Sequence, residues 1–263
     1  SFFFCAANCI VLFCFFFLLS TNVSIPDLES QFLLFAVGGG LAQILATVCV
    51  ILVFKSRNFA VGITLKKTEV ILTALVGLIL IGEGVSTISM FLICLGGAGV
   101  FFLSKKVSSV DRSNFSILNK SAVYGLLSGL LFAISAVCYR SATLSVVSDL
   151  VYLRAGFTLL IVILSQSFVM TIWLALFEPG QIKLVWLERK KGFWVGVTSL
   201  GGSFFWFTAF TLQNAAYVKA VGQIELIFSL LITTLFFKER ILNREILGML
   251  LIGISALGLI LVV

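Results

Sequence analysis

The stretch from Gln31 to Phe54, QFLLFAVGGGLAQILATVCVILVF, contains no charged residue. An α-helix needs about 20 predominantly apolar residues to cross the ~30 Å hydrocarbon core of a bilayer. Other charge-free runs of similar length are Ser1–Leu19, Gly84–Ser104, Ser121–Tyr139, Ala155–Phe177, Gly192–Val218 and Ile246–Val263. They do not alternate between apolar and polar residues, as the strands of a membrane barrel do. The sequence therefore predicts an all-α polytopic membrane protein.

The composition supports this fold class and excludes several functions. Hydrophobic residues make up 60% of the 263 residues and charged residues only 11%, whereas a soluble domain has about 25% charged residues. The absence of histidine removes the commonest general base and metal ligand. All six cysteines lie inside apolar runs, without metal-ligand spacing. We therefore predict no metal, no cofactor and no catalytic residue.

The net charge of +7 comes from Lys and Arg in the short breaks between apolar runs. A nucleic-acid-binding protein would instead carry a basic helical face with interleaved aromatic residues. Under the positive-inside rule, the breaks at Lys105–Lys120 and Lys183–Lys191 face the cytoplasm. The acidic break at Asp27 and Glu29, and the C-terminal Val263, then face outward.

Two further apolar runs, Val70–Gly82 and Leu226–Phe237, are too short to cross alone. The first becomes a full span if the helix extends upstream through Lys66, Lys67 and Glu69. The second does so if it includes Lys219 and Glu225. With these two spans, the sequence predicts nine transmembrane helices.

An internal repeat appears when the chain is shifted by 156 residues. The shift superposes Asn58 on Asn214, Ala60 on Ala216, Glu69 on Glu225, Glu83 on Glu239 and Gly97 on Gly253. We therefore predict a first repeat at 1–104, a cytoplasmic connecting loop at 105–120 and a second repeat at 121–263. The second repeat has five predicted helices and the first has four, so we expect a tenth helix before Ser1. An odd number of crossings separates Glu69 from Glu225, which makes the repeats inverted, as in many secondary transporters.

Three stretches carry a family resemblance: Asn58–Glu69 (NFAVGITLKKTE), Gln213–Glu225 (QNAAYVKAVGQIE) and Tyr139–Thr143 (YRSAT). The pattern resembles the EamA-like branch of the drug/metabolite transporter superfamily. The resemblance implies ten helices in two inverted five-helix repeats. Many members carry proline in the fourth and ninth helices, where this chain has charged and amide residues. The superfamily carries amino acids, nucleotide sugars, purine derivatives and drugs, so the cargo stays open.

The candidate substrate- or ion-binding residues are intramembrane charges and their neighbours: Lys67, Glu69, Lys219, Gln223, Glu225 and Arg154. Glu69 and Glu225 lie nine residues into their spans, or ~14 Å at 1.5 Å per residue, about half the hydrocarbon thickness. A charge at that depth costs at least ~2.5 kcal/mol and calls for a partner.

Each of these residues also has a structural interpretation. Glu69 can pair with Lys66 one turn away, and Lys219 can snorkel towards the membrane surface. Arg154 either reaches a cavity or anchors the end of its helix. The amides of Gln43 and Gln166 are typical of hydrogen bonds between helices, and the clusters Gly38–Gly40, Gly96–Gly99 and Gly201–Gly202 are typical of close helix packing.

These features predict a secondary-active transporter that moves a small metabolite or drug-like solute by alternating access. Proton coupling and exchange both stay open, as does a homodimer. The bilayer and a small-molecule substrate are its expected partners, in a bacterial inner (plasma) membrane. The alternatives are a membrane-embedded lipid-modifying enzyme, which needs a nucleophile beside a base or carboxylates around a metal, and a channel or scaffold protein, for which rings of like charge are expected. We expect no enzymatic activity.

Overall fold

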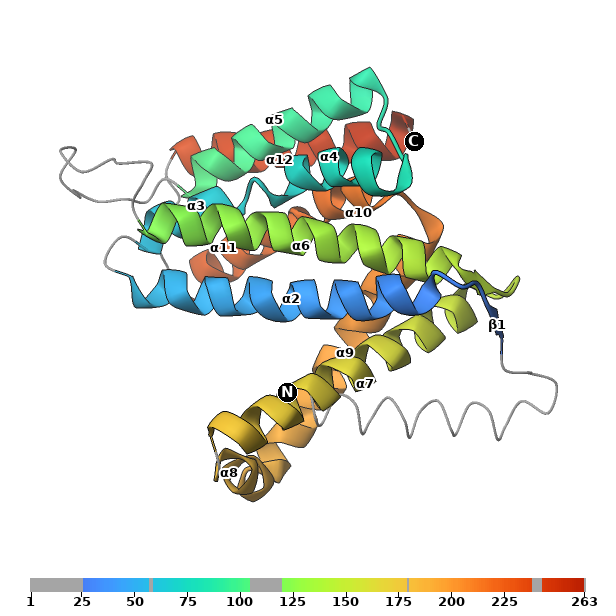
Figure 1. Ribbon diagram of the computed structural model, residues 1–263. Helices are drawn as coiled ribbons and strands as arrows, with labels where there is room; N and C mark the ends of the chain where they lie inside the picture. The colour runs from blue at the N-terminus through green and yellow to red at the C-terminus, as the bar shows by residue number, and fades with distance from the viewer. Residues whose placement is uncertain (1–25, 57–58, 105–119, 179, 238–242, 263) are drawn as a thin grey trace. The chain divides into compact units, whose positions relative to one another are not determined.

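The computed structural model describes residues 26–56, 59–104, 120–178, 180–237 and 243–262. Several predicted features lie outside these residues: the helix at Ser1–Leu19, the repeat positions Asn58 and Glu239, and nearly all of the 105–120 loop. The described helices are α2 (Phe32–Lys55), α3 (Phe59–Lys66), α4 (Glu69–Ile81), α5 (Thr87–Ser104), α6 (Lys120–Leu144), α7 (Val151–Phe177), α8 (Gln181–Leu187), α9 (Arg189–Leu212), α10 (Ala215–Gly222), α11 (Ile224–Phe237) and α12 (Asn243–Val262) (Figure 1). The prediction of an all-α membrane protein is confirmed at this level.

Six segments of the described chain are long and apolar enough to cross a membrane: Phe32–Lys55, Lys120–Leu144, Val151–Phe177, Arg189–Leu212, Ala215–Ile232 and Asn243–Val262. Thr87–Leu103 is a shorter apolar helix. Large apolar side chains point outward from these helices, as Leu261 does with 85% of its surface exposed and Phe168 with 68%. Such surfaces are stable against lipid tails and unstable in water. The count of nine helices stays a prediction.

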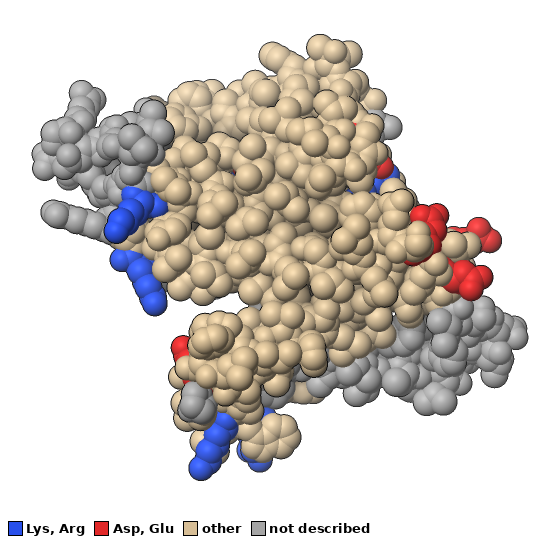
Figure 2. All heavy atoms as spheres, viewed as in Figure 1, with Lys and Arg blue, Asp and Glu red and all other residues tan. Residues whose placement is uncertain are grey.

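Charged side chains lie at both ends of α2. Asp27 and Glu29 are exposed before the first turn of α2, and Lys55 is exposed in its last turn. Figure 2 shows a broad surface without charge over the middle of α2 and α6, between described charges near their ends. The two ends of α2 therefore carry opposite charge, and the end that faces the cytoplasm stays a prediction.

The chain divides into two compact units. Unit 1 comprises 1–44 and 138–213, and unit 2 comprises 45–137 and 214–263. Each unit takes segments from both predicted repeats. The units are thus a different division of the chain, and the predicted domain boundaries stay untested.

Unit 1 contains α7, α8 and α9, together with the first part of α2 and the end of α6. Helices α7 and α9 lie side by side (Figure 1). A two-residue antiparallel ladder joins β1 (Asp27–Leu28) to β2 (Val146–Val147), with Leu28 opposite Val146. The ladder ties the segment before α2 to the segment between α6 and α7.

Unit 2 contains α3, α4, α5, α10, α11 and α12, and its most extensive helix pair is α5 with α12. Small residues let these two helices approach: a Cβ on Gly99 would lie 2.7 Å from the Gly248 carbonyl oxygen. The Ser255 hydroxyl donates to the Leu92 carbonyl at 2.7 Å. Close packing at the Gly96–Gly99 cluster is therefore confirmed. It is not found at Gly201–Gly202, where an added Cβ would meet no atom within 4 Å in the described structure.

Candidate functional site

Two helical segments of unit 2 are interrupted beside their charged residues. Helix α3 ends at Lys66 and α4 begins at Glu69, while α10 ends at Gly222 and α11 begins at Ile224. The sequence predicts continuous helices here, so the interruptions are a difference between prediction and structure. Each consists of one or two residues in a turn, with hydrogen bonds of the tighter 3₁₀ kind.

The physical cause of the first interruption is visible in its hydrogen bonds. The amides of Lys67 and Thr68 bond to the carbonyls of Thr64 and Leu65, both at 3.1 Å and three residues back. The Thr68 hydroxyl donates to the Leu65 carbonyl at 2.7 Å, and such local bonds compete with regular helix geometry. At the second interruption the Gln223 amide bonds to the Ala220 carbonyl in the same way, at 3.1 Å.

The two interruptions occupy corresponding positions in the sequence. Adding 156 to the bounds of α3, 59 and 66, gives 215 and 222, which are the bounds of α10. Adding 156 to the last residue of α4, 81, gives 237, the last residue of α11. The same shift takes Lys67 to Gln223 and Glu69 to Glu225. Corresponding positions therefore adopt the same secondary structure, except that Thr68 lies in the turn whereas Ile224 begins α11.

An ion pair joins the two interrupted segments. Lys219, in the last turn of α10, donates from Nζ to Glu69 Oε1 at 2.5 Å, and Glu69 is the first residue of α4. The side chains are only 18% and 13% exposed, respectively. The sequence offered Lys66 as the partner of Glu69, whereas the structure pairs Glu69 with Lys219, 150 positions along the chain. A carboxylate in the first turn of a helix also interacts favourably with the helix dipole.

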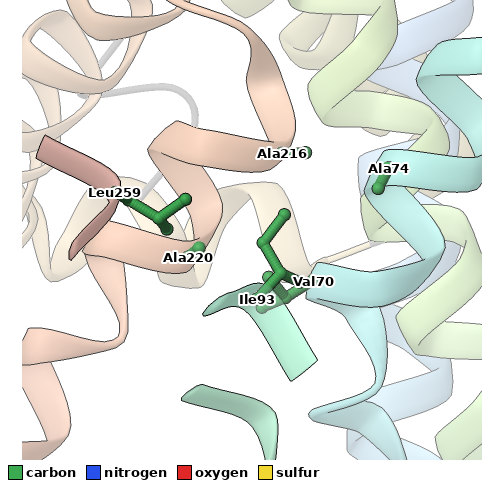
Figure 3. Close-up of a cluster of buried hydrophobic side chains, with 6 residues drawn as sticks. All are labelled: Val70, Ala74, Ile93, Ala216, Ala220 and Leu259. Atoms are coloured by element: carbon green, nitrogen blue, oxygen red, sulfur yellow. The ribbon is translucent and has the colours of Figure 1, made fainter. Parts of the chain in front are cut away.

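Beside the ion pair, the interrupted segments share an apolar core. Figure 3 shows its six buried side chains, which come from α4, α5, α10 and α12: Val70, Ala74, Ile93, Ala216, Ala220 and Leu259. Small alanines on α10 and α4 let the two backbones lie close together. This packing fixes the position of Glu69 and Lys219, because both belong to the same two helices.

Helix α6 lies against the first interruption through Phe132 and two glycines. Lys66 Nζ lies 4.7 Å from the Phe132 ring centroid, and Lys219 Nζ lies 5.9 Å from it. Both distances are within the range of a cation–π interaction. A Cβ on Gly125 would overlap the Gly62 carbonyl, and one on Gly129 would lie 3.0 Å from the Lys66 carbonyl oxygen. Sequence reasoning missed Phe132, because one phenylalanine among 27 carries no signal.

Lys67 is surrounded by charges and partly buried. Its ammonium group interacts electrostatically with Lys66, Glu225, Glu69 and Lys219. Across the described residues it makes no hydrogen bond or ion pair. The structure thus brings together Lys67, Glu69, Lys219 and Glu225, four of the six predicted site residues, in unit 2.

Gln223 adds a fifth predicted site residue to this cluster, beside Lys219. Gln223 Nε2 makes a long bond of 3.5 Å to the Lys219 carbonyl. Its Oε1 is buried and has no hydrogen-bond partner in the described structure. Glu225 is exposed in the first turn of α11. Lys219 pairs with Glu69, and the 156-residue shift places Ile63 at the position that corresponds to Lys219. The repeat therefore supplies no equivalent lysine for Glu225.

The sixth predicted residue, Arg154, belongs to unit 1 and lies at a helix end. Its Nε donates to the Thr143 carbonyl at 3.0 Å, in the last turn of α6. This bond fits the anchoring interpretation of Arg154. Arg140 does the same for α9, with Nη1 bonds of 2.8 and 3.0 Å to the carbonyls of Phe210 and Thr211.

Unit 1 also contains a buried polar network in an apolar surrounding. Gln43 Oε1 accepts from the Tyr139 hydroxyl and from Gln166 Nε2, both at 2.7 Å. Gln166 Nε2 also donates to the Gly40 carbonyl at 3.2 Å. The expectation that Gln43 and Gln166 bond between helices is confirmed, and the network joins α2, α6 and α7. Tyr139 additionally packs on Phe207 of α9, with ring centroids 4.6 Å apart.

Comparisons with known proteins bear on the fold alone. No family profile matches this chain, and no curated protein matches it. A solved structure described as "Crystal structure of protein" has a TM-score of 0.60 to this chain at 14% identity. The match covers 98% of this chain and 98% of that one. At this identity the likeness shows a shared fold alone.

Proposed function

We propose that this chain is a secondary-active membrane transporter that moves a small metabolite or drug-like solute by alternating access. The observation that carries the proposal is the pair of interrupted helical segments linked by the Glu69–Lys219 ion pair. Discontinuous helices at corresponding positions of two repeats form the solute site of several transporter folds. A mostly buried ion pair is costly in a membrane, so a protein that needed only a stable core would gain by replacing it with apolar residues.

A second observation supports two repeats related by a pseudo-two-fold axis within unit 2. Subtracting 156 from Ser255 and Gly248 gives Gly99 and Leu92. Exchange of the two repeats takes Gly99 to position 255 and Gly248 to position 92. The close approach of Gly99 to Gly248 therefore corresponds to the hydrogen bond from Ser255 to Leu92. The proposal includes ten helices in two inverted repeats and membership of the EamA-like branch of the drug/metabolite transporters. It also includes a bacterial inner membrane as the location.

The alternatives are less well supported by the described residues. A metal-dependent lipid-modifying enzyme needs clustered ligands, and the described residues contain no group of three or more Cys, Asp or Glu suited to a metal. A channel favours rings of one charge sign, whereas the cluster around Lys67 mixes lysines and glutamates. We infer no enzymatic activity. Proton coupling and solute exchange are both compatible with the cluster, as is a homodimer.

Counterflow in liposomes separates the three functions. Purified protein is reconstituted, and uptake of a panel of labelled metabolites is measured with and without the same unlabelled solute inside. A carrier is accelerated by internal solute, because the loaded site returns faster than the empty one. A channel gives current without acceleration, and an enzyme gives a chemically altered lipid or solute that mass spectrometry detects. Either of the last two results contradicts the proposal.

A further inference from the structure

The charges around Lys67 do not balance. The cluster in unit 2 contains three lysines, Lys66, Lys67 and Lys219, against two glutamates, Glu69 and Glu225. Glu69 is held by Lys219 at 2.5 Å. Lys66 lies on the Phe132 ring. Among the described residues, the positive charge on Lys67 therefore has only the exposed Glu225 as a counter-charge that is not already paired.

Lys67 lies in the turn between α3, which ends at Lys66, and α4, which begins at Glu69. The partial negative charge at the C-terminal end of α3 and the partial positive charge at the N-terminal end of α4 act on it in opposite directions. The ammonium group of Lys67 makes no hydrogen bond or ion pair among the described residues, although the side chain is not exposed. A partly buried ammonium group without hydrogen-bond acceptors is unstable. The binding of an anionic group would satisfy it.

Gln223 provides a second unsatisfied group in the same cluster. Its Oε1 is buried and has no donor in the described structure, while its Nε2 is directed to the Lys219 carbonyl. A carbonyl oxygen can only accept hydrogen bonds. The missing partner of Gln223 is therefore a hydrogen-bond donor, and the missing partner of Lys67 is an acid.

We propose that the solute is a small organic anion that also carries a hydrogen-bond donor. Its carboxylate or phosphate group binds the Lys67 ammonium group, and its donor binds Gln223 Oε1. This inference rests on the proposed function, because it names the class of solute for that site. Glu225 is the counter-charge of Lys67 in the empty site, and the anion of the solute replaces it. The Glu69–Lys219 pair holds the two interrupted segments together and does not contact the solute.

Binding to the purified full chain in a neutral detergent tests the inference without any transport. The probes are 3-phenyllactate, which has an acid and a hydroxyl donor, 3-phenylpropionate, which lacks the donor, and 3-phenyllactamide, which lacks the charge. Inorganic phosphate is included as a second acid. We expect calorimetry to rank phenyllactate above phenylpropionate and to detect no binding of phenyllactamide. Equal binding of phenyllactate and phenyllactamide would overturn the inference, and so would the absence of binding by every anion.

Two substitutions should act in opposite directions. Lys67→Met should weaken phenyllactate binding by about tenfold or more, since a hydrogen bond to a charged group is lost. Lys67→Arg should restore most of it. Glu225→Gln should tighten binding, because the competing counter-charge is removed. The exposed Lys183 on α8 provides the matched control, Lys183→Met, which should bind like the wild type. Unchanged affinity in Lys67→Met, with the thermal unfolding of the empty protein also unchanged, would contradict the assignment.

An anionic lipid headgroup has the same chemistry as the proposed solute. Titration is therefore repeated in micelles containing phosphatidylglycerol. We expect phenyllactate to bind equally well there, whereas competition by the lipid would reassign the site to lipid and overturn the inference. The proposed function and this inference can fail separately. Anion binding that depends on Lys67, without counterflow, would contradict the transport function alone. Counterflow of a neutral or cationic solute would contradict the anionic class of solute alone.

Discussion

Removal of one partner from the Glu69–Lys219 pair should destabilise the protein far more than removal of both. In Lys219→Met, Glu69 keeps its charge with a side chain that is only 13% exposed. Breaking a buried pair on one side costs about 3–5 kcal/mol. Because both side chains retain some exposure, we expect the lower end, about 3 kcal/mol of unfolding free energy, for Lys219→Met. Glu69→Gln leaves Lys219 close to Phe132, 5.9 Å from the ring centroid, and should cost less.

A double-mutant cycle measures this coupling. Unfolding of wild type, Lys219→Met, Glu69→Gln and the double variant is followed in mixed micelles with increasing SDS. We expect the double variant to be more stable than the sum of the single losses predicts, with a coupling free energy of about 1.5–3 kcal/mol. Lys183→Met, an exposed change on α8, should stay within about 0.5 kcal/mol of wild type. Losses that add to within about 0.5 kcal/mol would refute the ion pair.

Three further predictions concern packing, the network of unit 1 and topology. Gly125→Val should lower the thermal unfolding temperature of purified protein at a cost of about 1–3 kcal/mol, because its side chain would overlap the Gly62 carbonyl. Gly201→Ala, at a position with open space around it, is the control. Equal stability of the two variants would contradict the packing. Gln166→Leu should cost about 1–3 kcal/mol, because Gln43 and Tyr139 lose a shared partner, whereas an unfolding curve identical to that of wild type would remove the network from the account. Lys183→Cys in a cysteine-free background should react with an impermeant maleimide only after the membrane is opened, and labelling of intact cells would reverse the predicted orientation.

The helical membrane fold follows from the sequence because its signal is repeated and strong. Long charge-free runs such as Gln31–Phe54 have few alternatives once water is excluded as a solvent. The relation between Lys67–Glu69 and Gln223–Glu225 could also be predicted, since charged and amide residues are scarce within apolar runs. The bounds of α3 and α10 agree with that shift.

Other features depend on contacts between segments that are distant in sequence. Sequence reasoning gave Glu69 a neighbour one turn away, Lys66, but its partner is Lys219, 150 positions along the chain. The interruption at Thr68 depends on one hydroxyl bond to Leu65, and threonine is common within membrane helices. Phe132 joins the cluster because Gly125 and Gly129 let α6 approach α3. Neither phenylalanine nor glycine predicts such a contact by itself, because both are common in this sequence.

The central claim is that the interruption beside Lys67 is a solute site with alternating access. Lys67→Cys in a cysteine-free background, reconstituted in liposomes, tests it most directly. An impermeant methanethiosulfonate reagent is added from outside or is enclosed inside, and labelling is measured in each case. The account predicts labelling from either side, because alternating access exposes position 67 to each side in turn. Labelling from one side only, or from neither, would contradict it.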